Sequence, residues 1–308
     1  MATPRLIAEK NPKVNSLVEK SPTAGPAANW LLPRSDLPWG QRTLVMGVVN
    51  VTPDSFSDGG QFFDSQVAIE QGLRLLAQGA DVLDIGGEST RPGSEPITVD
   101  QELERVMPVI QGVLAKAPKA IISIDTYRAQ VADQAILAGA QIINDVTALR
   151  GDAGMASLAA SNGAGLILMH MQGEPKTMQA NPAYADVVAE VGDFLLAQAQ
   201  EAQTAGVARE RIVIDPGIGF GKTLDHNLAL IRGLSNLRKR GYPVLLGASR
   251  KAMLGKITGK PTGERLWATI GAHVAGAMLG ADMVRVHDVE PVRDAILVAD
   301  AVLRGGNA

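Results

Sequence analysis

Residues 120–145 read AIISIDTYRAQVADQAILAGAQIIND and contain a complete strand–helix–strand pattern. The two ends, 120–125 and 141–145, are short and continuously apolar, which is typical of strands buried on both faces of a parallel sheet. Between them, residues 128–138 carry apolar side chains at three- and four-residue spacing, as an amphipathic helix does. This stretch therefore predicts two parallel strands joined by a helix.

The same alternation continues along most of the chain after Thr43. The strand-like runs are TLVMGVVN (43–50), DVLDIG (81–86), AIISID (120–125), QIIND (141–145), GLILMH (165–170), RIVID (211–215), PVLLG (243–247) and DMVRVH (282–287). The helical stretches are 65–78, 100–116, 128–138, 186–205, 225–240, 264–279 and 291–303. Eight strands alternating with helices over about 260 residues predict an α/β fold, the (β/α)8 TIM barrel. An open doubly wound sheet is the alternative, but it usually carries G-x-G-x-x-G after its first strand, and that motif is missing.

The first 41 residues differ from the remainder in composition and in residue pattern. Prolines at positions 4, 12, 22, 26, 33 and 38 interrupt any helical pattern, and no apolar period is sustained. We therefore expect a flexible N-terminal extension over residues 1–41. We expect residues 42–308 to form a single barrel domain, since barrels of about 250 residues fold as one unit.

The composition narrows the possible chemistry. The 308 residues are 46% hydrophobic and 20% charged, as in an ordinary globular protein. Without cysteine, disulfides, thiolate nucleophiles and cysteine-bound metals are excluded. The net charge of −3 gives no basic field for nucleic acid, and no apolar run approaches the roughly 20 residues that span a bilayer. We expect a cytoplasmic protein that acts on small molecules and binds neither nucleic acid nor membranes.

Polar residues stand where each predicted strand ends. They are Asn50, Asp84, Asp125, Asn144 with Asp145, His170, Asp215, residues 249–251 and residues 285–288. The active sites of TIM barrels lie at the C-terminal ends of the strands. We therefore expect these side chains to converge in one mouth.

Two long loops follow the first two strands. Residues 50–60 exceed the usual two to six residues of such a loop, and the apolar Phe56 favours a lid over a solvated turn. Residues 86–94 combine glycines with the hydroxyl of Thr90 and the guanidinium of Arg91, which suits a phosphate. A plain glycine-rich turn is the alternative reading of the second loop.

Three strand ends carry groups that are costly to bury without partners: Asp125, Asn144 and Asp215. A ligand edge rich in N–H donors would satisfy them, and so would arginine side chains of the protein itself. Met169 and His170 fit plain packing inside the barrel.

The last two strand ends suit an anion. Arg285 and His287 alternate along one strand and therefore face the same way. Residues 249–251 open a helix, whose N-terminus favours negative charge. Arg250 also fits a structural ion pair with a barrel aspartate.

Eight motifs occur together in one order. They are NVTPDSFSDGG (50–60), DIGGESTRPGS (84–94), SIDT (123–126), INDV (143–146), LMHMQGEPKTMQ (168–179), DPGIGFGK (215–222), SRKAMLG (249–255) and RVHDV (285–289). By these motifs the chain closely resembles the bacterial dihydropteroate synthases, from about Leu44 to Leu303. The resemblance implies a (β/α)8 barrel, usually a homodimer, in folate biosynthesis. The implied reaction joins 6-hydroxymethyl-7,8-dihydropterin diphosphate to p-aminobenzoate and gives 7,8-dihydropteroate and pyrophosphate.

The resemblance also implies a role for each matching residue. The implied pterin contacts are Asp125, Asn144, Met169, Asp215, Gly219 and Lys251. The implied contacts of the diphosphate and Mg²⁺ are Thr90, Arg91, Arg285, His287 and the metal ligand Asn50. The implied p-aminobenzoate pocket comprises Phe56, Pro92, Phe220 and the start of the helix after Lys251. The implied catalytic residues are Asp58, which faces the reacting methylene carbon, Arg91, Asp125 and Lys251.

The mechanism implied by the resemblance needs no protein nucleophile. The C–O bond to the diphosphate breaks early and leaves a pterin cation, which Asp58 and Asp125 would stabilise. Mg²⁺, with Arg91, Arg285 and His287 as fixed positive charge, would stabilise the leaving diphosphate. The neutral aniline nitrogen then attacks, while the two closed loops exclude water.

Two other functions compete with this one. A methyltetrahydrofolate-binding methyltransferase domain has a similar barrel and pterin pocket, but it would not need the diphosphate residues Thr90, Arg91, Arg285 and His287. An inactive barrel kept as a scaffold would not need the complete set of motifs. One departure from the family pattern is Ala252, where relatives often carry serine.

Overall fold

Eight parallel strands form the centre of the molecule. The computed structural model describes residues 29–51, 61–89, 95–173 and 177–305, and only the backbone of residues 61–64. The strands are β3 (Leu44–Asn50), β4 (Val82–Gly86), β5 (Ile122–Asp125), β6 (Ile142–Asp145), β7 (Gly165–Met169), β8 (Ile212–Asp215), β9 (Leu245–Leu246) and β10 (Met283–Val286). Their order is β8-β7-β6-β5-β4-β3-β10-β9, and a parallel bridge between Ile214 and Val244 joins the two ends into a ring. The (β/α)8 barrel predicted from the sequence is confirmed.

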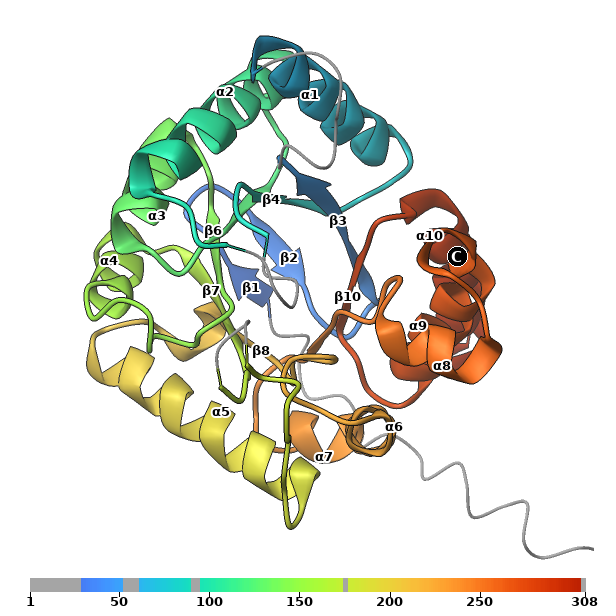
Figure 1. Cartoon of the computed structure of the whole chain (residues 1–308). Helices are drawn as coiled ribbons and strands as arrows, with labels where there is room; N and C mark the ends of the chain where they lie inside the picture. Colours follow the sequence, from blue (N-terminus) through green and yellow to red (C-terminus); the bar gives the residue numbers. More distant parts are fainter. Residues whose placement is uncertain (1–28, 52–60, 90–94, 174–176, 306–308) are drawn as a thin grey trace, which may run out of the picture.

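Helices surround this ring on the outside (Figure 1). They are α1 (Gln61–Ala77), α2 (Val99–Lys116), α3 (Ala129–Ala138), α4 (Met155–Asn162), α5 (Val187–Thr204), α6 (Leu224–Arg232), α7 (Leu234–Arg238), α8 (Ala252–Thr258), α9 (Leu266–Met278) and α10 (Val289–Arg304). Among the described residues, no helix is long and apolar enough to cross a membrane.

Two helices differ from the sequence expectation. The stretch 225–240, expected as one helix, is divided into α6 and α7 at Gly233. A Cβ at Gly233 would lie 2.8 Å from Val188 Cγ1, so the glycine allows α5 to approach the joint closely. Helix α4 was not expected, because its sequence MASLAASN is short and mostly small or polar.

A two-stranded hairpin covers the bottom of the barrel, opposite the C-terminal ends of the strands. Strands β1 (Asn29–Leu31) and β2 (Asp36–Pro38) are antiparallel. Trp30 and Trp39 stack with ring centroids 5.4 Å apart, and both are buried. The expectation of a flexible extension over 1–41 is therefore wrong for residues 29–41, while residues 1–28 lie outside the described residues. Of the prolines in the described part of this segment, Pro33 lies in the turn between the two strands and Pro38 ends β2, and the buried tryptophans supply the packing.

The barrel interior is divided into an apolar layer and a polar layer. Side chains alternate along a strand, so residues two apart point the same way. Met283 packs with the hairpin in the lower, apolar layer, and Arg285 lies above it on β10. The same step leads from Ile142 to Asn144 on β6. The lower layer is Leu44, Met46, Val82, Ile121, Ile142, Ile167, Val213, Leu245 and Met283. The upper layer is the floor of the mouth.

Candidate active site

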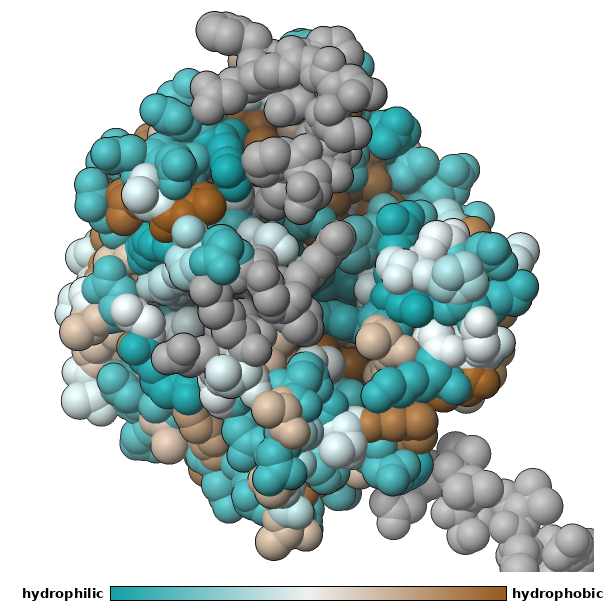
Figure 2. Space-filling model, viewed as in Figure 1, coloured by the Kyte–Doolittle hydropathy of each residue, from teal (hydrophilic) through white to brown (hydrophobic). Residues whose placement is uncertain are grey.

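One cavity opens at the C-terminal ends of the strands. Its volume is about 760 Å³. The described residues to which the family resemblance gives a role all line it: Asn50, Asp125, Asn144, Met169, Asp215, Gly219, Phe220, Lys251, Arg285 and His287. Asp84, Asp145 and His170, which were also expected in the mouth from their strand ends, do not line the cavity. Phe56, Asp58, Thr90, Arg91 and Pro92 lie outside the described residues. Figure 2 shows this face, on which hydrophilic residues predominate and apolar ones are scattered in small groups.

Arg285 is clamped between two carboxylates of the floor. Its Nε donates to Asp84 Oδ2 at 2.6 Å, and its Nη2 donates to Asp125 Oδ2 at 2.7 Å. Burial alone would lower the pKa of Arg285, but the two carboxylates overcome that effect and raise it. The sequence left open whether a ligand or an arginine of the protein would pair with Asp125. In the structure, Arg285 pairs with it. Asp84, noted only as a strand end, is the fully buried hub of this cluster.

Asp125 carries an unusual protonation equilibrium. Burial, together with the charge of Asp84, raises the pKa of Asp125 to about 7 despite the attraction of Arg285. Asp84 and Asp125 share the guanidinium of Arg285, so the negative charge of Asp84 works against the ionised form of Asp125. Deprotonated Asp125 is consequently stabilised by any positive charge that develops in the cavity.

The remaining floor groups present hydrogen-bond acceptors to the cavity. Asn144 Nδ2 donates to Asp84 Oδ2 at 3.0 Å, and this bond leaves the amide oxygen of Asn144 as the group available to a ligand. Asp215 Oδ1 accepts from Gly217 N at 2.7 Å, and burial raises the pKa of Asp215 to about 6. Asp125, Asn144 and Asp215 together therefore suit a flat ligand edge that carries several N–H donors.

A cation and an aromatic ring form one wall. Lys251 is the N-cap residue of α8, and its Nζ lies 4.0 Å from the centroid of the Phe220 ring. Its neighbour Arg250 has a positive φ of 58° and is paired with Asp288, Nη2 to Oδ1 at 2.6 Å. The structural ion pair expected for Arg250 is therefore present. This turn directs Lys251 into the cavity, while the first turn of α8 begins at Ala252 beside it.

His287 is neutral in this environment. Its Nδ1 lies 3.0 Å from Ser249 Oγ, and burial with the charge of Arg285 lowers the pKa of His287 to about 3. Burial and the charge of Arg285 therefore work against the positive charge expected of His287, and its role at the diphosphate stays a prediction. A neutral imidazole can still donate one N–H bond to an anion.

Met169 and His170, at the end of β7, have different surroundings. Met169 packs with Val146, Met171 and Met178 in a small apolar cluster and also lines the cavity. His170 instead contacts Lys222, a buried cation that our sequence analysis did not single out. Its position in the sequence could have identified Lys222, because it ends the motif DPGIGFGK and directly follows the glycines.

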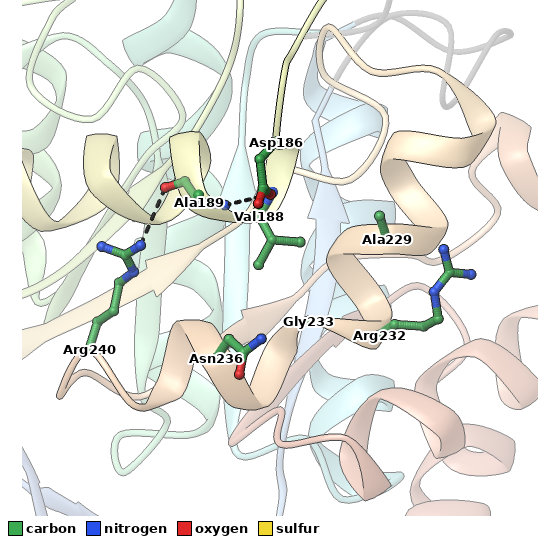
Figure 3. A pocket seen from close by; sticks show the side chains of 8 residues that line it. All are labelled: Asp186, Val188, Ala189, Ala229, Arg232, Gly233, Asn236 and Arg240. Carbon is green, nitrogen blue, oxygen red and sulfur yellow. Dashed lines mark hydrogen bonds between the residues drawn. The ribbon is translucent and has the colours of Figure 1, made fainter.

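A second hollow lies on the outside of the barrel, between α5 and the α6–α7 pair (Figure 3). Its volume is about 470 Å³. Asp186 there caps α5 by accepting from Val188 N, and Arg240 donates to Ala189 O and pairs with Asp193. Because these polar groups already serve the fold, we assign the chemistry to the barrel mouth.

Comparisons with known proteins agree with this geometry. The sequence pattern of the family described as pterin binding enzyme matches residues 46–287. The dihydropteroate synthase of Synechocystis sp. is 47% identical over 268 residues, which cover 86% of this chain and 92% of that protein.

The similar solved structures are also dihydropteroate synthases. The Xanthomonas albilineans dihydropteroate synthase with 4-aminobenzoic acid has a TM-score of 0.85 at 42% identity, covering 91% of this chain and 100% of that one. The Burkholderia cenocepacia dihydropteroate synthase complexed with 7,8-dihydropteroate has a TM-score of 0.80 at 44% identity, covering 90% and 96%. At these identities both sequence and fold are shared over nearly the whole barrel.

Proposed function

The chain belongs to the pterin-binding enzymes, among the dihydropteroate synthases, and from this premise we propose which reaction its mouth performs. The reaction joins 6-hydroxymethyl-7,8-dihydropterin diphosphate to p-aminobenzoate, and the products are 7,8-dihydropteroate and pyrophosphate. The observation that carries the proposal is the acceptor floor formed by Asp125, Asn144 and Asp215 inside one cavity.

The pterin lies on this floor. The amino and ring N–H groups of a pterin are donors along one edge, and they match the three acceptors. Met169 supplies an apolar surface from β7, and Lys251 supplies a donor for the pterin carbonyl from the start of α8. Gly219 lies beside Lys251 and lets the wall approach closely, because a Cβ there would lie 3.4 Å from Lys251 Cδ.

The diphosphate faces Asn50 and His287. Asn50 ends β3 and lines the cavity, and no cluster of three carboxylate or imidazole groups suited to a metal exists among the described residues. Mg²⁺ usually keeps few protein ligands and takes its others from substrate phosphates and water, so Asn50 with a diphosphate fits it. Bound Mg²⁺ would neutralise charge on the leaving diphosphate. Thr90 and Arg91 are proposed partners from sequence alone.

The p-aminobenzoate lies between Phe220 and the start of α8. The ring of Phe220 offers a flat apolar surface, and the free backbone N–H groups after Lys251 suit the carboxylate. Ala252 contributes no hydroxyl, so backbone amides and water carry this contact. Phe56 and Pro92 complete the pocket in the proposal carried over from the family motifs.

The chemistry follows from these positions. The C–O bond to the diphosphate breaks first, and the electron pair leaves with the diphosphate. The resulting pterin cation lies against Asp125, whose carboxylate gains an attractive partner. Asp58 keeps the role carried over from the family motifs, in which it faces the reacting methylene carbon. The aniline nitrogen then forms the new C–N bond and releases one proton. No protein atom bonds covalently to the substrate.

We further propose that the enzyme is a homodimer through the outer faces of α9 and α10. These helices pack together and expose large apolar side chains, with Trp267 79%, Val302 72% and Val298 66% exposed. Large exposed apolar side chains gathered on two neighbouring helices are typical of protein interfaces. Light scattering should give the mass of two chains, and Val298→Glu with Val302→Glu should halve it. A monomeric parent protein would contradict this proposal. The cytoplasmic location stays a prediction.

The function is tested by following pyrophosphate release. Release should require both the pterin diphosphate and p-aminobenzoate, and it should stop when Mg²⁺ is chelated. A methyltransferase would instead consume methyltetrahydrofolate without releasing pyrophosphate, and a scaffold would do neither. Pyrophosphate release that does not depend on p-aminobenzoate would contradict the proposed condensation.

A further inference from the structure

Lys222 is a buried cation with no role in the reaction described so far. It ends the loop that follows β8 and is 3% exposed. Its Nζ lies 3.0 Å from His170 Nδ1, 3.3 Å from His170 O and 2.9 Å from Phe220 O. An ammonium group has three N–H donors and no acceptor, so these three contacts use all of them.

The contact with His170 fixes the state of both side chains. Nδ1 can accept from Lys222 only when the imidazole is neutral and carries its proton on Nε2. Burial, with the charges of Lys222 and Arg150, lowers the pKa of His170 to about 3, which keeps the ring neutral. Burial, with the charge of Lys251, lowers the pKa of Lys222 to about 7, whereas the charge of Asp215 favours its charged form.

The loop held by Lys222 packs closely against the segment that follows β7. Gly217, Gly219 and Gly221 have φ values of +67°, +87° and +64°. A Cβ at Gly217 would lie 1.9 Å from His170 O, and one at Gly221 would lie 2.5 Å from Gln172 O. The loop therefore rests backbone against backbone on the segment after β7. Lys222 joins the two from the loop side, and from the segment after β7 Tyr184 OH donates to Gly221 O at 3.0 Å and Gln179 Nε2 donates to Gly219 O.

This loop carries one wall of the cavity. Phe220, whose carbonyl accepts from Lys222, places its ring under Lys251 Nζ. Asp215, the pterin acceptor, begins the same loop. A change at Lys222 should therefore move Phe220, in the p-aminobenzoate wall, through the bond to its carbonyl. It should also alter the charge that Asp215 experiences in the pterin floor.

We propose that Lys222 is a positioning residue of this enzyme: its buried ammonium, held by His170 and bonded to Phe220 O, fixes Phe220 for p-aminobenzoate on the wall beside the pterin floor. The inference rests on the proposed function, because it assigns those two substrates to the two walls. Lys222 itself need not touch either substrate.

The charged groups around Lys222 and Asp215 determine in which direction the pKa of Asp215 should move when Lys222 is removed. Asp215 faces Lys251 from α8, Arg285 from β10 and Lys222 from its own loop, and all three favour its ionised form. Lys222 faces Asp215, His170 and Lys251. Asp125 titrates nearby, but its charged neighbours are Asp84, Arg285, Glu102 and Lys251. Removal of Lys222 should therefore raise the pKa of Asp215 and leave that of Asp125 in place.

The test uses Lys222→Met, with exposed Lys239→Met as the matched control. Steady-state kinetics should show a KM for p-aminobenzoate raised roughly 5- to 10-fold. Calorimetry of pterin diphosphate binding at pH 5 to 8.5 should show near-parent affinity at pH 8.5. The acid-side loss of binding should begin at a higher pH than in the parent. Lys239→Met should match the parent in both measurements.

A second variant covers the case in which Lys222→Met does not fold. His170→Phe removes the acceptor and keeps an aromatic ring beside Phe194, with which His170 makes an edge contact at 4.9 Å. It should raise the same KM by a smaller factor. An unchanged KM and an unchanged pH midpoint in an active, folded variant would overturn the proposal. Equal loss at every pH with both KM values intact would also overturn it, as a merely structural role. A parent protein that releases no pyrophosphate would instead defeat the proposed function.

Discussion

Replacing Asp215 with asparagine should weaken substrate binding and stabilise the empty protein at the same time. In the parent protein, Asp215 Oδ1 accepts from Gly217 N at 2.7 Å, so an asparagine oxygen would keep that position. The new amide NH₂ would then face the cavity and meet the N–H groups of the pterin. Leaving such donors unpaired costs about 1–3 kcal/mol, which corresponds to roughly 5- to 150-fold weaker binding.

The stability effect has the opposite sign. Burial raises the pKa of Asp215 from 3.8 to about 6, so its ionised form destabilises the folded state. Above pH 6 this penalty is about 3 kcal/mol, and a neutral asparagine avoids it. A raised carboxyl pKa means that the folded state binds the extra proton between about pH 4 and 6. The advantage of the variant should therefore be complete above pH 6 and nearly gone at pH 4.

The assays are calorimetry with the pterin diphosphate at pH 8 and thermal unfolding of the unliganded protein from pH 4 to 8. At about 2 °C per kcal/mol, the melting temperature at pH 8 should rise by roughly 6 °C. Asp36→Asn, at an exposed position of the hairpin on the opposite end of the barrel, is the matched control and should change neither quantity. Unchanged pterin affinity would remove Asp215 from the site, and a lower melting temperature at pH 8 would refute the burial argument.

Three further substitutions test other parts of the molecule. Ala252→Ser adds a hydroxyl donor at the start of α8 and should lower the KM for p-aminobenzoate a few-fold without changing pterin affinity; the reverse pattern would show that the two pockets are misplaced. Arg91→Ala should lower kcat more than it weakens pterin diphosphate binding, and a purely ground-state effect would contradict the leaving-group role. Trp30→Ala removes a fully buried ring that donates from Nε1 to Arg211 O at 2.9 Å, and should cost about 3–5 kcal/mol of unfolding free energy by denaturant titration with KM values intact.

The sequence predicts the barrel because all eight strand-like runs are continuous and separated by helical periods. Prediction from the sequence fails where tertiary packing overrides the local residue pattern. Gly233 divides a helix whose period continues through it, and Trp30 orders a proline-rich segment that has no period of its own.

Much of the lining of the mouth is also predictable, because polar residues end the strands, although Asp84, Asp145 and His170 do not line the cavity. The pairing inside it is not. Nothing in the order of residues indicates that Asp84 holds both Asn144 and Arg285, because the three lie on β4, β6 and β10 and meet only when the ring closes. Lys222 is missed for a similar reason: its acceptors include His170, which lies 52 positions away.

The closure of the ring at β8 and β9 has a consequence for how substrates act on the fold. Across this seam the described residues show one parallel bridge, and Ile214 N donates to Pro243 O at 3.0 Å. Strand β9 itself has two residues, so the seam should be the first part of the barrel to open in native-state hydrogen exchange. Asp215 lies at the end of one edge, and Lys251 follows the other. A pterin that contacts both ties the edges together from above, and amide protection along β8 and β9 then becomes a direct measure of occupancy.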